Sequence, residues 1–278
     1  MPIDPSAAVG AALPERTFAW TESDVQLYQL AIGATELRHT LQTAGLQVLP
    51  SFAVVAPNFH ETDPPPLDLP GCDIDLSQVV HGSQEVVVHA PVPTSGKATL
   101  ATRISDVWDK GKAAVIWQEG TATGEDGREL WTVRSSIFVR GEGGWGGDRG
   151  SSTAVDIPDR APDTDTTYDV LPQQALLYRL CGDRNPLHAD PEFASAAGFP
   201  APILHGLCTY GITLREVTEA LLGGDATAVG GFRARFAGVV FPAETLRIRA
   251  WDTGDDIVID ATVGDGRPAL ADCVLTKA

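Results

Sequence analysis

The sequence predicts an α+β protein made of two similar halves. Each half ends in runs of alternating, β-branched residues, which are typical of antiparallel strands. A glycine-rich segment with linker composition lies between the two halves. The run LYQL at residues 27–30 returns as LYRL at residues 177–180. The shared order of these features indicates that one strand-rich unit occurs twice in the chain.

The first half is predicted to begin with a helix and to end in strands. Residues 21–32 open on a Thr, Ser and Asp start signal and carry apolar residues at helical spacing. The apolar run 46–55 favours a buried strand or a strand-like turn. The four prolines of residues 58–71 predict an exposed loop. Strand patterns follow at 84–89, 97–107, 113–123 and 130–140.

The boundary between the halves is predicted in residues 141–152, where six of the twelve residues are glycine. Such a composition favours a flexible connection over a packed element. We therefore predict an N-terminal unit at residues 1–140, a linker at 141–160 and a C-terminal unit at 161–278.

The second half is predicted to contain a long central helix that the first half lacks. Residues 207–222 have an amphipathic helical pattern, which two glycines end. The pair His205-Gly206 precedes this helix. We match that pair with His81-Gly82 of the first half, which leads almost directly into a strand. Further strand patterns lie at 231–237, 244–252, 257–263 and 268–276.

Composition narrows the range of partners and compartments. The formal net charge of −17 argues against nucleic acid or an anionic membrane as the main partner. No apolar run approaches the roughly 18 residues that a membrane span needs, and the first residues lack a signal-peptide pattern. The four cysteines are scattered without a C-x-x-C pair. We therefore expect buried thiols in a cytoplasmic protein.

The groups best suited to move protons are concentrated in residues 178–210. This stretch holds two of the six histidines and a Gly-Asp-Arg-Asn-Pro turn sequence. Pro186 biases Asn185 away from helical geometry. Asp183 and His188 therefore belong to a shaped loop and not to one face of a helix. Such a loop can direct a carboxylate, an amide and an imidazole toward one small volume.

This stretch resembles the signature of the MaoC-like (R)-specific enoyl-CoA hydratases, also called hydratase 2. The resemblance rests on GDRNPLH at residues 182–188, DPEFA at 190–194 and GFPAPILHGL at 198–207. It implies a double hot dog fold, in which two units with antiparallel sheets are fused and the C-terminal unit has the full central helix.

The resemblance also implies different tasks for the two units. Residues 32–34 read Ile-Gly-Ala where residues 181–183 read Cys-Gly-Asp, so the carboxylate of the motif has no copy in the first half. The N-terminal unit would accommodate the acyl chain, and the C-terminal unit would carry the chemistry. We further expect an acyl-CoA thioester as the substrate and a homodimer as the assembly.

Hydration of a conjugated thioester requires a base for water, an acid for the α-carbon and donors for the thioester oxygen. In the resembled family, the positions of Asp183 and His188 activate one water together, and the position of Asn185 helps to hold that water. The resemblance implies that the Gly206 amide, at a helix start, is the oxyanion donor. His205 would shape the substrate pocket.

Each of these residues also has a purely structural interpretation. Asp183 would cap a turn, and His188 would be a loop histidine with satisfied hydrogen bonds. Gly206 would allow tight packing at a helix start, and His205 would be a buried histidine bonded to a backbone carbonyl. Asp183, His188 and His205 could also form a metal triad. No H-x-H or H-E-x-x-H spacing supports that triad, and we predict no metal.

Coenzyme A carries phosphates, so its binding to an acidic chain requires a local basic cluster. Arg233 and Arg235 are predicted on one face of a strand, and Lys110 and Lys112 in a turn of the first half. Both segments resemble parts of the family near the coenzyme, and we predict that all four residues bind CoA. Solvated surface charge is the alternative. We expect no cofactor apart from the CoA of the substrate.

The leading functional prediction is a hydro-lyase of fatty acid metabolism, which hydrates trans-2-enoyl-CoA reversibly, by syn addition, to (R)-3-hydroxyacyl-CoA. A 3-hydroxyacyl dehydratase that acts on acyl carrier protein is an alternative, because both substrates present the same pantetheine arm. A thioesterase would need a hydrolytic nucleophile or carboxylate in place of the GDRNPLH loop. A non-catalytic acyl-thioester binding protein would not need the intact acid, amide and imidazole set.

Overall fold

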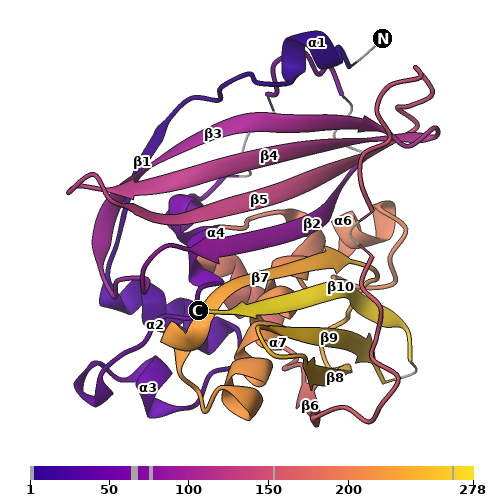
Figure 1. Cartoon of the computed structure of the whole chain (residues 1–278). Coiled ribbons are helices and arrows are strands. Elements are labelled where there is room, and N and C mark those ends of the chain that lie inside the picture. Colours follow the sequence, from indigo (N-terminus) through magenta and orange to yellow (C-terminus); the bar gives the residue numbers. More distant parts are fainter. Residues whose placement is uncertain (1–2, 64–67, 75–77, 153, 265) are drawn as a thin grey trace.

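The computed structural model describes residues 3–63, 68–74, 78–152, 154–264 and 266–278, which form one ten-stranded antiparallel sheet with helices on one face (Figure 1). The strands of the first half are β1 (Arg16–Trp20), β2 (Val79–Val88), β3 (Gly96–Asp109), β4 (Ala113–Gly124) and β5 (Glu129–Arg140). Those of the second half are β6 (Thr164–Asp169), β7 (Val229–Phe236), β8 (Thr245–Asp252), β9 (Asp256–Val263) and β10 (Pro268–Lys277). The eight strand runs predicted between residues 84 and 140 and between residues 231 and 276 are all present, and β1 and β6 are additional.

The two halves of the sheet join along β2 and β7. These strands pair antiparallel, from Ser83 opposite Arg235 to Val87 opposite Gly231. The order outward from this seam is β5, β4, β3, β1 on one side and β10, β9, β8, β6 on the other. Each half therefore repeats the same strand order about an approximate two-fold axis at the seam. This arrangement confirms the predicted α+β class and the double hot dog architecture.

The helices are short, with two exceptions in α2 and α7. The α-helices are α1 (Pro5–Ala8), α2 (Glu22–Ala31), α3 (Leu37–Thr40), α4 (Phe52–Val55), α5 (Gln174–Tyr178), α6 (Pro191–Ala196) and α7 (Gly206–Leu221). The 3₁₀ turns are η1 (Gln42–Ala44), η2 (Ala56–Asn58), η4 (Arg179–Cys181), η5 (Pro186–His188) and η6 (Ala226–Ala228). The predicted start of α2 is confirmed, because Thr21 and Asp24 form a capping box there.

The helix α7 is the full central helix of the second half. Most of its residues are buried, and it packs against β6, β7, β8 and β10. The equivalent place in the first half holds only the single turn of α4 followed by η2. For residues 46–55 the sequence predicts a buried strand or a strand-like turn, but the segment ends in a helical turn on which Phe52 and Val55 are buried. A short apolar run that is buried on several sides has no period that separates strand from helix.

The LYQL and LYRL runs occupy equivalent places in the two halves. Residues 27–30 lie in α2 and residues 177–180 in α5 and η4, and the rings of Tyr28 and Tyr178 lie 6.1 Å apart. Gly33 and Gly182 follow these runs with φ values of +80° and +106°. Both halves therefore make the same left-handed turn after the repeated run. Only the second half continues from this turn into Asp183.

The match between His81-Gly82 and His205-Gly206 is wrong. His81 and Gly82 lie within β2, which is the equivalent of β7, whereas His205 and Gly206 begin α7. Two identical residues in each half were too little to fix the alignment of the repeat, because the segments before β2 and β7 differ in length and structure.

Residues 141–152 and 154–163 form a strap along one end of the strands, between β5 and β6 (Figure 1). The strap touches the outer face of the sheet, by which we mean the face opposite α7. A Cβ on Gly150 would lie 2.1 Å from the ring of Trp108, and the Val155 amide donates to the Asp272 carboxylate at 3.3 Å. The predicted proline-rich loop at 58–71 lies partly outside the described residues. Within the described ranges, no helix is long and apolar enough to cross a membrane.

Candidate active site

The loop that carries Asp183 turns sharply at the end of η4. A Cβ on Gly182 would lie 2.0 Å from the carbonyl oxygen of Asn58, so only glycine fits against the first half here. The Asp183 carboxylate accepts a hydrogen bond from the Asn185 amide at 3.1 Å. The Asn185 side chain in turn accepts one from the Leu187 amide at 3.0 Å. These bonds give the loop the turn structure that its Asn-Pro sequence predicts.

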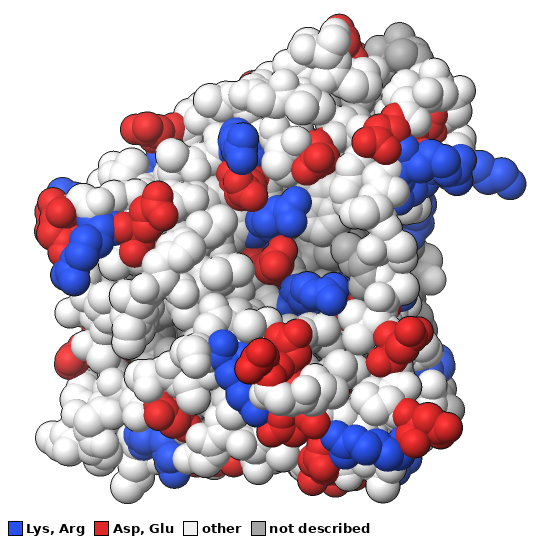
Figure 2. Space-filling view, viewed as in Figure 1, with Lys and Arg blue, Asp and Glu red and all other residues white. Residues whose placement is uncertain are grey.

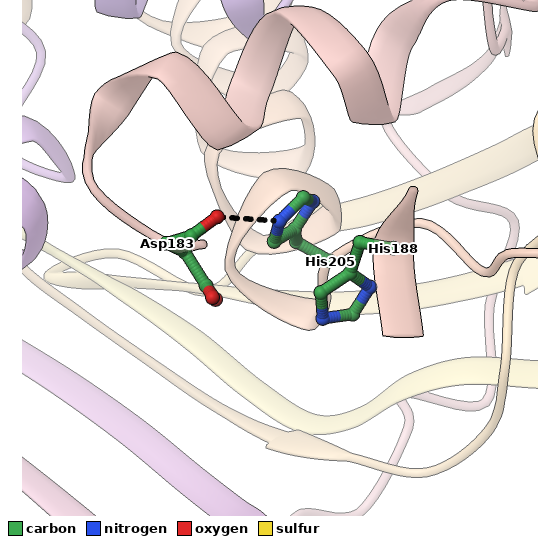
Figure 3. A group of neighbouring side chains, drawn as sticks. All are labelled: Asp183, His188 and His205. Carbon is green, nitrogen blue, oxygen red and sulfur yellow. Dashed lines mark hydrogen bonds between the residues drawn. The ribbon is translucent and has the colours of Figure 1, made fainter. Parts of the chain in front are cut away.

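Asp183, His188 and His205 converge from three elements (Figure 3). Asp183 belongs to the loop, His188 to η5 and His205 to the N-cap of α7. One potential ligand atom from each of the three side chains, a carboxylate oxygen or a ring nitrogen, lies within 4.8 Å of the other two. The His188 Nδ1 lies 2.9 Å from the carbonyl oxygen of Ile203. Because a carbonyl can only accept, Nδ1 carries the proton and Nε2 keeps its lone pair.

His205 supports this pair from the protein interior. It is 1% exposed, and its ring stacks on that of His188 with centroids 3.7 Å apart and an interplanar angle of 27°. The His205 Nε2 donates to the main-chain oxygen of Asp183 at 3.4 Å, the contact drawn in Figure 3. His205 is thus a buried histidine bonded to a backbone carbonyl, and that carbonyl belongs to the loop carboxylate residue.

Burial lowers the pKa of both imidazoles. For His188, loss of solvation is the largest effect, and the negative charge of Asp183 opposes it. For His205, burial and the neighbouring His188 hold the pKa well below its usual range. Both rings are therefore neutral at neutral pH, and the Nε2 of His188 is able to accept a proton.

Gly206 begins α7 directly after His205. It is exposed, and its amide is one of the first four in the helix that lack an intrahelical partner. A Cβ on Gly206 would lie 2.9 Å from the ring of Phe236, so glycine is needed at this position. A donor at the positive end of α7 therefore lies one residue away from the cluster of Asp183, His188 and His205.

His81 of the first half also faces this site, which the sequence analysis did not recognise. The pairing of β2 with β5 shifts between His81 and Ser83, so Gly82 is the extra residue of a β-bulge. The bulge turns His81 to the inner face, where its ring centroid lies 4.6 Å from that of Phe236. The ring is open to solvent, yet desolvation by the surrounding protein lowers its pKa to about 4, opposed in part by the charge of Asp183. Gly82 was the available signal, because glycine inside a strand often marks a bulge.

Arg233 and Arg235 lie on the outer face of the sheet. Phe232 packs on α7, and side chains alternate along a strand, so both arginines point to the other side as predicted. They line a cavity of about 220 Å³ that Trp108 also lines. The Arg235 guanidinium is paired with the Asp272 carboxylate at 2.6 Å. Figure 2, which views this face, shows acidic and basic side chains interspersed over the seam.

The lysines predicted to bind CoA lie at the turn between β3 and β4. Lys110 is half-buried, with its Nζ 4.8 Å from the ring centroid of Trp108, and Lys112 is exposed. The Lys112 carbonyl accepts the amide that follows Arg140, and the Lys110 ammonium donates to the main-chain oxygen of Arg149. We call Lys110, Lys112, Arg140 and Arg149 the corner cluster.

The corner cluster differs from most other cations of the protein. Within the described part of the chain, none of its four members pairs with a carboxylate, whereas most other lysines and arginines do. Figure 2 shows blue side chains, with red ones beside them, at the edge where Figure 1 places this turn and the strap. On a chain with a net charge of −17, these four cations are candidates for binding an anion.

Among the described residues, the side chains of Asp183, His188 and His205 also lie close enough together to bind one metal ion. A carboxylate with two imidazoles is a plausible donor set for zinc or iron. One nitrogen of each ring is already engaged with a backbone oxygen. A metal bound by the remaining lone pairs would occupy the atoms that proton transfer requires.

Two family models match the chain, one for each half. The MaoC like domain matches residues 153–268, and the MFE-2 hydratase 2 N-terminal domain matches residues 18–141. Both halves are thus similar to domains that carry hydratase or dehydratase names.

Similarity to individual proteins extends over nearly the whole chain. The chain is 57% identical to the enoyl-CoA hydratase ChsH3 of Mycobacterium tuberculosis, over 93% of this chain and 92% of that one. It is 39% identical to the peroxisomal enoyl-CoA hydratase 2 of Arabidopsis thaliana, over 90% and 88% of the two chains. The crystal structure of a MaoC-like dehydratase from Phytophthora capsici is similar with a TM-score of 0.93 at 28% identity, and the match covers 99% of this chain and 98% of that one.

Proposed function

Since the chain belongs to the MaoC-like enoyl-CoA hydratase family, we propose that it hydrates trans-2-enoyl-CoA reversibly to (R)-3-hydroxyacyl-CoA in fatty acid metabolism. The enzyme is a hydro-lyase. The observation that carries the assignment is the convergence of the Asp183 carboxylate, the neutral His188 imidazole and the Gly206 helix terminus. This set supplies a proton acceptor, a proton donor and an oxyanion donor at one place.

Asp183 and His188 act on one water molecule. The pair takes a proton from the water while the water oxygen forms a bond to C3 of the enoyl group. Nε2 of His188 is the acceptor with a free lone pair, because Nδ1 donates to Ile203. The Asn185 side chain already accepts the Leu187 amide, which leaves its NH₂ group to hold the water.

The electrons of the double bond move toward the thioester oxygen during this attack. The Gly206 amide and the positive end of α7 stabilise the charge that develops there. C2 then takes a proton from the Asp183–His188 pair, so that H and OH have been added across the double bond. Because one loop provides both groups, both additions occur on the same face of the alkene, so the addition is syn and gives a single enantiomer. Membership of the hydratase 2 family identifies that enantiomer as (R).

The coenzyme is recognised by basic residues of both halves. We assign Lys110 and Lys112, together with Arg140 and Arg149, to the CoA phosphates, because these cations lack carboxylate partners in the described residues. Arg233 and Arg235, which line the cavity on the outer face, also bind CoA in this proposal. His205 shapes the substrate pocket. No cofactor or metal takes part, since the three reacting groups belong to the protein.

The acyl chain extends into the first half, which has only α4 and η2 where the second half has α7. The second half alone therefore carries one active site per chain, and the first half gives room for the chain. Medium and long enoyl-CoA substrates should be converted at least as efficiently as crotonyl-CoA. A steady decline of kcat/KM from four carbons upward would contradict this role of the first half.

We also propose a compartment and an oligomeric state for the protein. Four free cysteines, three of them buried, support a reducing compartment such as the cytoplasm. The relative from Arabidopsis thaliana, in contrast, is described as peroxisomal. We also propose a homodimer, which light scattering on the purified protein would test.

The direct test is a hydration assay with crotonyl-CoA that follows the loss of conjugated enoyl absorbance. We expect turnover without added metal and in the presence of a chelator. An acyl carrier protein substrate is the main competitor for the natural substrate, because both carry pantetheine. Parallel assays with crotonyl-CoA and a crotonyl carrier protein would decide between them, and we expect the higher kcat/KM with CoA.

A further inference from the structure

The carboxylate of Asp109, at the end of β3, binds four backbone amides. It accepts hydrogen bonds from Gly111 at 2.8 Å, Gly144 at 2.7 Å, Gly146 at 2.7 Å and Gly147 at 3.3 Å. The residue is 3% exposed. The amides, with Gly144 the largest contribution, lower the pKa of this carboxyl to about 2, so it is ionised at any physiological pH.

The glycines make this arrangement possible. Gly144 and Gly146 have φ values of +84° and +81°, which let successive amides point toward one anion. Such a concavity of backbone N–H groups is a typical anion site, and here the anion is a side chain of the chain itself. The start of the strap is thus wrapped around Asp109 instead of extending as a flexible linker.

This contact also fixes the corner cluster. The Asp109 amide donates to the Asp148 carbonyl at 2.7 Å, which holds the strap on the other side of Asp109. The next strap residue is Arg149, whose carbonyl accepts the Lys110 ammonium. Gly150 then packs on the ring of Trp108, over which Lys110 lies. The position of the Lys110 charge therefore depends on a strap that Asp109 holds.

We propose that Asp109 is a positioning residue for recognition of the CoA phosphates: it holds the glycine-rich start of the strap so that Lys110 and Arg149 present their charges at one corner. The inference rests on the proposed function. Asp109 itself does not touch the substrate, because its oxygens are engaged with amides of the protein. Its effect is on binding of the nucleotide end of CoA and not on the chemistry at Asp183.

Replacement of Asp109 by Asn is the sharpest perturbation. Asn has nearly the same shape, but it replaces one acceptor oxygen by an NH₂ donor that would face backbone N–H donors. At least one of the glycine amides then loses its partner and the strap loosens. Both carboxylate oxygens are thus required at this position as hydrogen-bond acceptors, and a side chain of the same size does not restore the contact.

The test compares crotonyl-CoA with the crotonyl thioester of N-acetylcysteamine, which has the reacting group but no nucleotide. We expect Asp109→Asn to raise KM for crotonyl-CoA roughly tenfold with little change in kcat, as expected for a contact made equally in ground and transition states. The kcat/KM for the truncated thioester should be unchanged. The matched control is Asp126→Asn, in the turn between β4 and β5, where the carboxylate accepts only the nearby Arg128; it should leave both substrates unaffected.

An equal loss of activity on both thioesters would overturn the proposal, because it would show a purely structural role. An unchanged KM for crotonyl-CoA would overturn it as well. If Asp109→Asn does not fold, Gly146→Ala loosens the same loop, since a Cβ there meets nothing within 4 Å but the φ of +81° disfavours alanine. The same split between the two thioesters is expected for that variant, and its absence would contradict the proposal. A native enzyme inactive on both thioesters would instead reject the proposed function.

Discussion

The imidazoles of His188 and His205 lie nearly parallel, with ring centroids 3.7 Å apart, and burial keeps both of them neutral. His188 has its free nitrogen in the active site, whereas His205 donates to the main chain of Asp183. His188 is therefore placed to move a proton. His205 contacts both His188 and Asp183, the two residues that act on the water.

Two substitutions of His205 separate its ring from its hydrogen bond. His205→Phe keeps a flat ring against His188 but removes the donor to Asp183, and it should lower kcat up to roughly tenfold, in line with a hydrogen bond worth about 0.5–1.5 kcal/mol. His205→Gln keeps an N–H at a similar distance from the backbone and should retain more activity. KM should change little in both. Full activity of His205→Phe would show that the bond to Asp183 is unimportant.

Substitution of the reacting groups should reduce turnover and leave the fold intact. Asp183→Asn and His188→Ala should each lower kcat by roughly 10² or more, since general acid and base groups contribute about 10² to 10⁴. Because both groups act on one water, the double variant should lose little more than either single variant. Circular dichroism and thermal unfolding serve as controls for folding. Near-native turnover of either single variant would remove the mechanism.

The lowered pKa values predict that the protein loses stability in acid. Unfolded imidazoles take up a proton near pH 6.5, whereas the buried His188 and His205 resist protonation in the folded state. The unfolded state therefore binds more protons below about pH 6.5, and the free energy of unfolding should decrease as the pH is lowered from there toward the folded pKa values. Urea denaturation at successive pH values measures this slope.

His205→Phe should reduce that slope, because it removes one imidazole that is buried in the neutral form. His89→Ala is the matched control, since His89 is exposed. A slope equal to that of the native protein in His205→Phe would mean that His205 is protonated as easily in the folded as in the unfolded protein.

The charges at the corner and on the outer face should differ in importance. Lys110→Gln should raise KM for crotonyl-CoA without a large change in kcat, because the contact is equal in the ground and transition states. Arg235→Gln should have a smaller effect, since its charge is already paired with Asp272. Higher salt should reduce the difference between native enzyme and Lys110→Gln. Unchanged KM values in Lys110→Gln and Arg235→Gln would show that these cations are solvated surface charges without a role in CoA binding.

Much of this fold was predictable because its signals are local. The strand runs, the capping box at Thr21 and the long helix pattern after His205 each follow from residue type and spacing. The loop from Gly182 to His188 was also predictable. Its turn residues determine the backbone conformation, and its carboxylate, amide and imidazole indicate proton transfer.

The remainder depended on contacts between distant segments. Glycine inside a strand is a signal for the bulge at Gly82, but no local pattern shows that His81 would meet Phe236 across the seam. The run 46–55 favours a buried strand or a strand-like turn because burial on several sides removes the period that identifies a helix. The ordering of the strap by Asp109 could not be predicted either. A glycine-rich sequence predicts a flexible segment unless an acceptor for its amides is known, and here that acceptor is Asp109.

The stereochemistry of the product tests the central claim most directly. Asp183 and His188 lie on one loop and can reach only one face of the bound alkene, so hydration of crotonyl-CoA should be a syn addition that gives one enantiomer. The family to which the chain belongs identifies this product as (R)-3-hydroxybutyryl-CoA. In D₂O, the deuterium at C2 and the hydroxyl at C3 should be on the same side, as determined by NMR spectroscopy together with chiral chromatography. The account predicts the (R) isomer as the single product. Formation of the (S) isomer, or of a mixture, would contradict it.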